Sequence, residues 1–415
     1  MQLDFKGGSG EVGRSAVLVN EEILLDYGIK PGDYPEYPLN GIFPKTVMVS
    51  HGHLDHCGAV ANLMDLHPEV FMSPMTSRFA QILGKDTLKI SEDRGIPTPY
   101  DERDLQVMAQ RTRLIDAGES FRTHGYDAQF YDAGHIPGAC GIYLEEPDGK
   151  SLFYTGDIST TDTRLVGGAK EFPEADTLII ESTYYSVDHP PRRETEERFI
   201  DSLYDTLDIG GTVLIPAFAI GRTQEIMLLL QSEGIPAYVD GMGVRMFKEM
   251  MEHPDSIRNP KELGRAFENA TMVTGAKRKQ VELENSVIVT TAGMLNGGPI
   301  LYYLEKLYDN PKTKIMLTGY QVEGTNGRLA IEKGMIENND RVMHLKPKIE
   351  QYDFSAHCGE KELKGIVNHF CRNGTETVIA MHGDGQSTKD FAEWAAETHG
   401  VEAYAPENSE TYIVD

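Results

Sequence analysis

The amino-acid sequence predicts a layered α/β protein in which one domain is inserted into another. Short apolar strands separated by Gly, Pro and Asn turns fill residues 1–185. Strands alternate with helices over residues 186–350, a pattern typical of βα units and a mostly parallel sheet. Strands and helices also follow over residues 351–415, and no long linker separates the three segments. We therefore expect the first and third segments to form one domain and the middle segment to form a second.

The first segment is rich in strands and contains one expected helix. The strands carry Val, Ile, Leu and Phe, and turn residues separate them. The helix is expected over residues 55–66, where Ala59, Leu63 and Leu66 lie near one face. The expected strands occupy residues 3–7, 15–20, 22–28, 46–50, 111–117, 127–135, 141–146, 151–157 and 177–183.

The middle and last segments contain most of the expected helices. In the middle segment each helix follows a strand, as a parallel sheet requires. The strands there are expected at residues 212–217, 237–240, 287–293 and 314–320, with helices at 221–234, 243–252 and 299–308. The last segment is expected to hold strands at 350–357 and 377–383, helices at 360–371 and 387–399, and two further short strands.

Composition and charge exclude several classes of protein. Apolar residues make up 40% and charged residues 25% of the chain, which is typical of globular rather than disordered proteins. No apolar run approaches the roughly 18 residues of a membrane helix, and the N-terminal residues do not resemble a signal peptide. We therefore expect a cytoplasmic protein with no membrane contact. The net charge of −26 argues against a generic basic nucleic-acid binder, so a polyanionic substrate needs local positive charge or metal ions.

Residues 50–58 read SHGHLDHCG and crowd three histidines and an aspartate into six positions. His51 follows a buried-type strand, and residues two apart in an extended segment face the same way, so His51 and His53 can reach one metal ion. Asp55 and His56 follow where the chain turns into a helix, and they can bind a second ion. Imidazole and carboxylate ligands suit Zn²⁺, with Mn²⁺ or Fe as weaker options. The alternative, a His-rich surface turn, is disfavoured by the spacing.

Three further ligand-type residues lie next to Gly at the ends of apolar strands. They are His135, Asp157 and His382, and each alone fits a turn or capping residue equally well. Together with the first cluster they complete two metal sites, each with a position left for water. We expect His51, His53 and His135 to hold one ion, Asp55, His56 and His382 to hold the other, and Asp157 to bridge them.

Asp26 also stands at a strand end. We expect it to orient a ligand histidine such as His51 rather than to bind metal, with a plain turn aspartate as the alternative. The four Cys are scattered without a C-x-x-C pair, which fits a reducing compartment. Cys57 and Cys358 each follow a histidine of interest, and we expect small buried thiols rather than ligands.

The motifs resemble those of the metallo-β-lactamase superfamily. Asp26, H-x-H-x-D-H at 51–56, His135 and Asp157 are similar to its four successive motifs. Glu181 and His357, with His382, resemble three further motifs of the β-CASP nuclease branch. The segments IPAFAIGRTQE, TTAGMLNGGP and LTGYQVEGTNGR resemble its inserted domain. Look-alikes are archaeal homologues of the nuclease subunit of the cleavage and polyadenylation machinery and the RNase J group.

This resemblance implies a fold and a reaction. The fold is an αββα sandwich with a dinuclear zinc site at one edge and an inserted β-CASP domain. The reaction is hydrolysis of phosphodiester bonds in single-stranded RNA during RNA processing or decay, cut internally or from the 5′ end. A histidine at position 382 is typical of RNA-processing rather than DNA-processing members. The resemblance also allows a homodimer and protein partners that supply specificity.

The residues permit a specific division of roles. Asp55 is placed to orient the attacking water, His357 is the candidate general acid, and Glu181 is expected to hold its imidazole protonated. Gly-rich turns after strands can cradle phosphates, which makes Arg222, Thr291, Gly293 and Arg328 candidate substrate contacts.

Other activities remain open from the residues alone. A DNA nuclease is disfavoured by His382, and a small-molecule hydrolase of the lactamase or thioesterase type has no use for Glu181 and His357. A non-catalytic RNA-binding scaffold is disfavoured because no expected ligand is missing.

Overall fold

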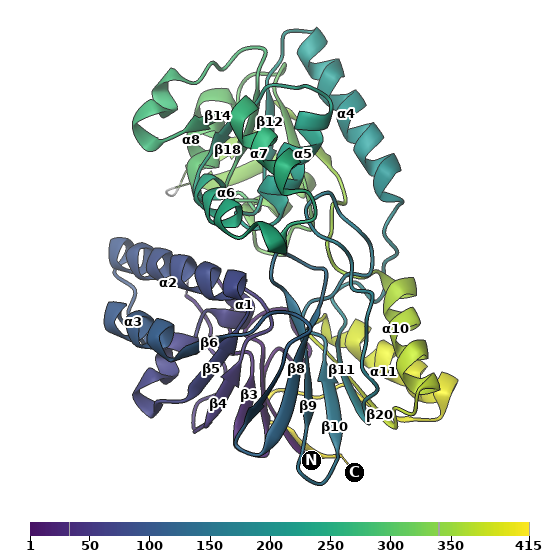
Figure 1. Ribbon diagram of the computed structural model, residues 1–415. Coiled ribbons are helices and arrows are strands. Elements are labelled where there is room, and N and C mark those ends of the chain that lie inside the picture. Colours follow the sequence, from purple (N-terminus) through teal and green to yellow (C-terminus); the bar gives the residue numbers. More distant parts are fainter. Residues whose placement is uncertain (33, 339–340, 415) are drawn as a thin grey trace. The chain divides into compact units, whose positions relative to one another are not determined.

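The computed structural model describes residues 1–32, 34–338 and 341–414. The chain forms two compact units, of which the first contains residues 1–162, 167–188 and 356–415 and the second contains residues 163–166 and 189–355. The middle of the chain therefore forms a unit of its own, as Figure 1 shows. The divisions at 188/189 and 355/356 fall a few residues after the expected boundaries at 185/186 and 350/351. Residues 163–166, expected in the first domain, belong to the second unit because Glu225 accepts hydrogen bonds from the backbone N–H groups of Arg164 and Leu165.

Two seven-stranded sheets form the first unit. Most of their strands are rich in Val, Leu, Ile and Phe, and most residues of these strands are buried. The first sheet has the order β22 (Thr411–Ile413), β1 (Gln2–Gly7), β2 (Ala16–Val19), β3 (Ile23–Leu25), β4 (Thr46–Met48), β5 (Glu69–Met72) and β6 (Thr112–Leu114). The second has the order β21 (Glu402–Tyr404), β20 (Thr377–Met381), β11 (Thr177–Glu181), β10 (Ser151–Tyr154), β9 (Cys140–Glu145), β8 (Tyr126–Asp132) and β7 (Ser120–Thr123).

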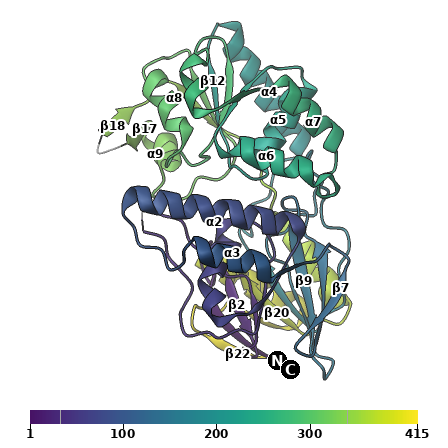
Figure 2. The ribbon, with the colours of Figure 1, turned by 60° about the vertical axis from the view of Figure 1, so that its left-hand side comes forward.

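Helices cover the outer face of each sheet, which confirms the αββα sandwich (Figures 1 and 2). The helices α2 (Pro74–Arg94) and α3 (Glu102–Arg111) lie beside the first sheet, and α10 (Glu360–Arg372) and α11 (Gly385–His399) lie beside the second. Side chains of both sheets, such as Phe5 and Ile142, form one apolar core between them. A second core lies between the first sheet and its helices. The two ends of the chain meet where β1 pairs with β22.

The helix expected over residues 55–66 is divided. A short helix α1 (Leu54–Cys57) ends at Gly58, and a 3₁₀ helix η1 covers Val60–Leu66. The backbone N–H of Ala59 donates to Tyr27 O at 2.9 Å, which draws the chain away from the helical path at that residue. The helices α2 and α3 are additions to the expected elements, which left residues 67–110 unassigned.

A parallel sheet and its helices form the second unit. The expected helices appear as α5 (Arg222–Ser232), α6 (Met242–Glu252) and α8 (Pro299–Leu307), and α4 (Arg192–Asp208), α7 (Pro260–Asn269) and α9 (Asn326–Lys333) are additional. Within the described part of the chain, no helix is long and apolar enough to cross a membrane. The strand order is β14 (Thr271–Val273), β13 (Tyr238–Asp240), β15 (Val287–Thr290), β12 (Val213–Pro216), β16 (Lys314–Leu317) and β19 (Lys348–Gln351), and all neighbours are parallel.

Candidate metal centre

The seven predicted ligands lie in the first unit and converge in two groups that share Asp157. Four of them follow the carboxyl ends of strands from both sheets: His51 after β4, His135 after β8, Asp157 after β10 and His382 after β20. Because these strand ends meet at one edge of the sandwich, residues far apart in the sequence come within ligand distance of one another. The two groups are His51, His53, His135 and Asp157, and Asp55, His56, Asp157 and His382.

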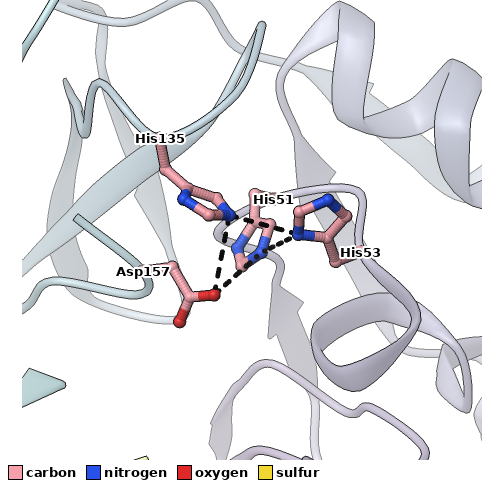
Figure 3. Close-up of side chains that lie close together, drawn as sticks. All are labelled: His51, His53, His135 and Asp157. Carbon is pink, nitrogen blue, oxygen red and sulfur yellow. Dashed lines mark hydrogen bonds and ion pairs between the residues drawn. The ribbon is translucent and has the colours of Figure 1, made fainter. Parts of the chain in front are cut away.

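The first group brings three imidazoles and one carboxylate together (Figure 3). His53 Nδ1 lies 3.2 Å from His51 Nε2 and 3.2 Å from His135 Nε2. Asp157 Oδ2 lies 3.5 Å from His51 Nε2 and 3.7 Å from His135 Nε2. Four ligand atoms placed tetrahedrally around zinc, each about 2.0–2.1 Å from the ion, lie about 3.3 Å apart. The spacing of this group therefore suits a single tetrahedral metal ion.

The second group contains buried polar atoms that have no hydrogen-bond partner among the described residues. These atoms are His56 Nε2, His382 Nε2 and Asp157 Oδ1. His56 Nε2 lies 3.3 Å from Asp157 Oδ1, and His382 Nε2 lies 3.5 Å from Asp55 Oδ2. Buried polar atoms are costly when unpaired, and converging lone pairs of this kind are satisfied by a cation. The donors of this group also fit a metal ion.

Backbone contacts fix the segment that carries Asp55 and His56. Ile29 N donates to Leu54 O at 2.8 Å, and Tyr27 N donates to His56 O at 2.9 Å. Residue 28, between Tyr27 and Ile29, must be glycine, because a Cβ at Gly28 would lie 1.8 Å from Asp55 O. The segment that follows β3 therefore holds the short helix α1, and with it two candidate ligands, in place.

Asp26 holds His56 directly and reaches His51 only through Ser50. Its Oδ2 accepts from His56 Nδ1 at 2.7 Å, from Ser50 Oγ at 2.7 Å and from the hydroxyl of Tyr154 at 2.8 Å, and its Oδ1 accepts from Ser50 N at 2.7 Å. The ligand histidine that Asp26 contacts directly is therefore His56, whereas the expectation gave His51 as its example. The reason is that Asp26 turns at φ 58°, which aims its carboxylate at the residue on α1. Ser50 and Tyr154 were not predicted, although Ser50 directly precedes His51 and Tyr154 ends the strand that leads to Asp157.

The charge states of the ligands follow from burial and from each other. Burial, reinforced by neighbouring imidazoles, lowers the pKa of His51 and His135 well below the usual value, which keeps both rings neutral. Burial opposes ionisation of Asp157, but His382, His56 and His357 outweigh it and hold the pKa of Asp157 well below its usual range. Neutral imidazoles and an ionised carboxylate are the forms in which the side chains of the first group bind metal. In the second group, burial disfavours the charged rings of His56 and His382, but Asp157 and other carboxylates outweigh burial and raise the pKa of both.

A third group places a histidine and a carboxylate beside Asp157. His357 Nδ1 lies 3.0 Å from each carboxylate oxygen of Glu181, and His357 Nε2 lies 3.8 Å from Asp157 Oδ2. Burial disfavours the charged imidazole, but the Glu181 carboxylate outweighs it and raises the pKa of His357. The ring of Tyr184, which was not predicted, lies 5.7 Å from the His357 ring. The arrangement can hold a proton at Nε2 of His357, next to the first metal group.

The cysteines stand apart from the ligand groups. Cys57 and Cys358 are buried, and burial raises the pKa of both thiols. Neither thiol belongs to any ligand group found among the described residues.

The predicted phosphate contacts lie in the second unit, after the carboxyl ends of its strands. Arg222 begins α5 and donates to Thr318 O, and Thr291 Oγ1 accepts from Met242 N at 3.3 Å. Gly293 O accepts a hydrogen bond from the side-chain amide of Gln321 at 3.3 Å. Arg328 lies in the first turn of α9 and pairs with Glu332 at 2.6 Å. These contacts give each residue a structural role, and the phosphate role stays a prediction.

Three family models match the chain in succession. A β-lactamase superfamily domain matches residues 36–202, a Beta-Casp domain matches residues 223–329, and a Zn-dependent metallo-hydrolase RNA specificity domain matches residues 342–406. The chain belongs to the β-CASP family of the metallo-β-lactamase superfamily. It is a metal-dependent hydrolase, as the matched domains and the converging His and Asp ligands agree.

Proteins of this family from archaea are similar to the chain over nearly its whole length. The "Probable RNase MJ4" of Methanocaldococcus jannaschii is 36% identical over 99% of both chains. The "RNase aCSPSF2" of Saccharolobus solfataricus is 34% identical over 98% of this chain and 84% of its own. A "Transcription termination factor FttA" of M. jannaschii is 31% identical over 98% of this chain and 71% of its own. A crystal structure of a protein of unknown function from Enterococcus faecalis V583 shares the fold, with a TM-score of 0.60, 11% identity and coverage of 100% and 99%.

Proposed function

We propose that the chain hydrolyses phosphodiester bonds of single-stranded RNA with two zinc ions. One observation carries the proposal: Asp157 is shared by two metal-ligand groups and by the group that contains Glu181 and His357. A hydrolase that acts on small molecules needs the first two groups but not the third. Support for RNA comes from the matched RNA specificity domain, which spans both His357 and His382, and from relatives that are named as RNases.

Two ions would be held by the chain's own side chains. The first would bind to His51, His53 and His135, the second to Asp55, His56 and His382, with Asp157 between them. When bound, the ions would lower the pKa of a water molecule and offset the charge that gathers on the phosphate. Zinc is favoured because the donors are mostly imidazoles and because the matched C-terminal domain is described as zinc-dependent.

The protein side chains position the water and protonate the leaving group. The oxygen of water forms a new bond to phosphorus and releases one proton to solvent, the bond from phosphorus to the 3′ oxygen breaks, and His357 donates its Nε2 proton to that oxygen. Glu181 holds the imidazole from the opposite side and favours its protonated form. Asp55 accepts a hydrogen bond from the water and so orients it. The products would be a 5′-phosphate and a 3′-hydroxyl.

The test uses end-labelled single-stranded RNA and DNA of the same sequence. The purified chain should cut the RNA, EDTA should stop the reaction, and added Zn²⁺ should restore it. A parallel series with Mn²⁺ separates the choice of metal from the activity. RNAs with 5′-triphosphate and 5′-monophosphate ends distinguish internal cutting from 5′-to-3′ degradation. Absence of chelator-sensitive RNA cleavage under every metal condition refutes the proposal, and cleavage of DNA in preference to RNA assigns a different substrate.

A further inference from the structure

The sheet of the second unit has a topological switch point between β12 and β15. The connection from β12 through α5 leads past β15 to β13, whereas the connection from β15 through α8 leads past β12 to β16. Crossovers between parallel strands are right-handed, so two connections that run in opposite directions place their helices on opposite faces of the sheet. The loops that leave the carboxyl ends of β12 and β15 therefore diverge. Open α/β sheets bind ligands in the crevice at such a point.

Two exposed aromatic side chains lie in loops at this switch point. Phe218 follows β12 and is 38% exposed, and Tyr320 follows the neighbouring strand β16 and is 55% exposed. A Cβ at Gly319 would lie 4.0 Å from Phe218 Cε2, and a Cβ at Gly293 would lie 3.1 Å from Phe218 N. Phe218 thus lies against the loops that follow both neighbouring strands, and Tyr320 is the next residue after Gly319.

Hydrogen bonds connect the loops that follow β12, β15 and β16 and hold the backbone that carries these two rings. The Gln321 amide donates to Gly293 O at 3.3 Å and to Gly319 O at 3.1 Å, and Gln351 also donates to Gly319 O at 3.0 Å. The guanidinium of Arg222 donates to Thr318 O. The loops after β12, β15 and β16 are therefore tied together, and ordering them on a ligand costs little additional entropy.

We infer that Phe218 and Tyr320 form a stacking platform for unpaired nucleobases of RNA. The inference rests on the proposed function and adds a base contact to its phosphodiester chemistry. Every base offers an aromatic face, so stacking on Phe and Tyr holds single strands without selecting a sequence. In a duplex these faces are covered, so the platform favours unpaired RNA. Among the described residues of these loops, Val322 is the one other large apolar side chain that is substantially exposed, too small an addition for a stable protein interface.

Binding is measured apart from catalysis. The probe is a single-stranded RNA that carries 2-aminopurine, and EDTA is present so that no cleavage occurs. We expect quenching of the 2-aminopurine fluorescence on binding. Phe218→Ala and Tyr320→Ala should each raise Kd roughly 5- to 100-fold, the range for loss of one stacked base. Phe218→Tyr and Tyr320→Phe keep a ring and should bind like wild type. Tyr204→Ala, at a 41% exposed tyrosine on α4, is the matched control and should leave Kd unchanged.

A second probe with abasic sites distinguishes stacking from a general loss of fold. Wild type should bind abasic RNA less tightly than RNA with bases, and the two Ala variants should lose that preference. Equal affinity of wild type for both RNAs, or Ala variants that bind as wild type does, overturns the inference even when cleavage is intact. So does an equal loss of binding in the ring-preserving variants, because the side chains are then structural. Aromatic-dependent binding by a chain that does not cleave RNA upholds the inference and refutes the proposed function.

Discussion

The buried Asp26 carboxylate offers the sharpest test of how the second metal group is held. The substitution Asp26→Asn keeps the size of the side chain and removes its charge. Asp26 Oδ2 accepts from three donors, and Oδ1 accepts from a backbone N–H. The NH₂ group of the new asparagine cannot accept a hydrogen bond. Whether it replaces Oδ1 or Oδ2, it therefore faces at least one donor that has lost its acceptor. Where it replaces Oδ2, His56 Nδ1 loses its acceptor, and the ring then favours a proton on Nε2, the atom that points into the second group.

The size of the effect follows from these contacts. Loss of a partner that orients a metal ligand typically costs about 10- to 100-fold in metal affinity. That range corresponds to about 1.4–2.8 kcal/mol at 25 °C. Leaving the buried donor on Ser50 or His56 unpaired costs a further 1–3 kcal/mol of folding stability, roughly. None of the three imidazoles of the first group contacts Asp26 directly. The metal ion of the first group should therefore be retained in Asp26→Asn.

The assay is metal content after dialysis, followed by competition with a chromophoric zinc chelator. Wild type should retain about two ions per chain and Asp26→Asn about one, because two ligand groups are present and one depends on Asp26. Asp240→Asn is the matched control, because Asp240 is also a buried carboxylate, held by Arg278 and Tyr303 in the other unit. It should lower thermal stability and leave metal content unchanged. A folded Asp26→Asn chain with two ions of unchanged affinity refutes the reasoning.

Three other substitutions test the roles of His357, His382 and Glu350. His357→Ala should reduce RNA cleavage by about 10²- to 10⁴-fold, as expected for a lost general acid, while bound metal is retained; loss of metal would instead make it a ligand. His382→Ala should weaken one ion and leave the other, and unchanged affinity of both would exclude His382 as a ligand. Burial raises the pKa of Glu350, but contacts with Lys348, Ser202 and Tyr352 outweigh burial and lower the pKa to about 2. The stabilisation from Glu350 is therefore present above its unfolded pKa and is lost as pH falls towards 2. Glu350→Gln should lower stability by about 1 kcal/mol near pH 7, after allowance for solvent screening, and the difference should vanish in thermal melts towards pH 2.

The positions of the candidate ligands could be predicted because each is a local feature of the sequence. A polar residue at the end of an apolar strand is visible without a structure, and alternate residues of an extended segment share a face. The partner of Asp26 could not be predicted in this way. Its carboxylate points to His56 because Asp26 adopts a left-handed turn and because residues 27–29 pair with α1, and neither fact is encoded in the spacing of the motif.

The fold was predictable where one face of an element is plainly apolar, and less so elsewhere. The helices α5 and α8 carry runs of apolar residues and were expected. The helix α4 carries charged residues over most of its length, so its sequence resembles an exposed linker. The break in the helix over residues 55–66 depends on a hydrogen bond from Ala59 to Tyr27, a contact between distant segments. Such tertiary hydrogen bonds override local helix preference.

The strand β10 links the core of the sandwich to the metal centre. Leu152 and Tyr154 face the core between the sheets, whereas Phe153 faces outward and stacks on Phe370 at 5.4 Å. The Tyr154 hydroxyl crosses from the second sheet to Asp26, which follows a strand of the first. A slip of β10 by one residue would turn Tyr154 outward and also displace Asp157, three residues further on. The apolar packing that fixes the register of β10 therefore also fixes the carboxylate that both ligand groups share with the group of Glu181 and His357.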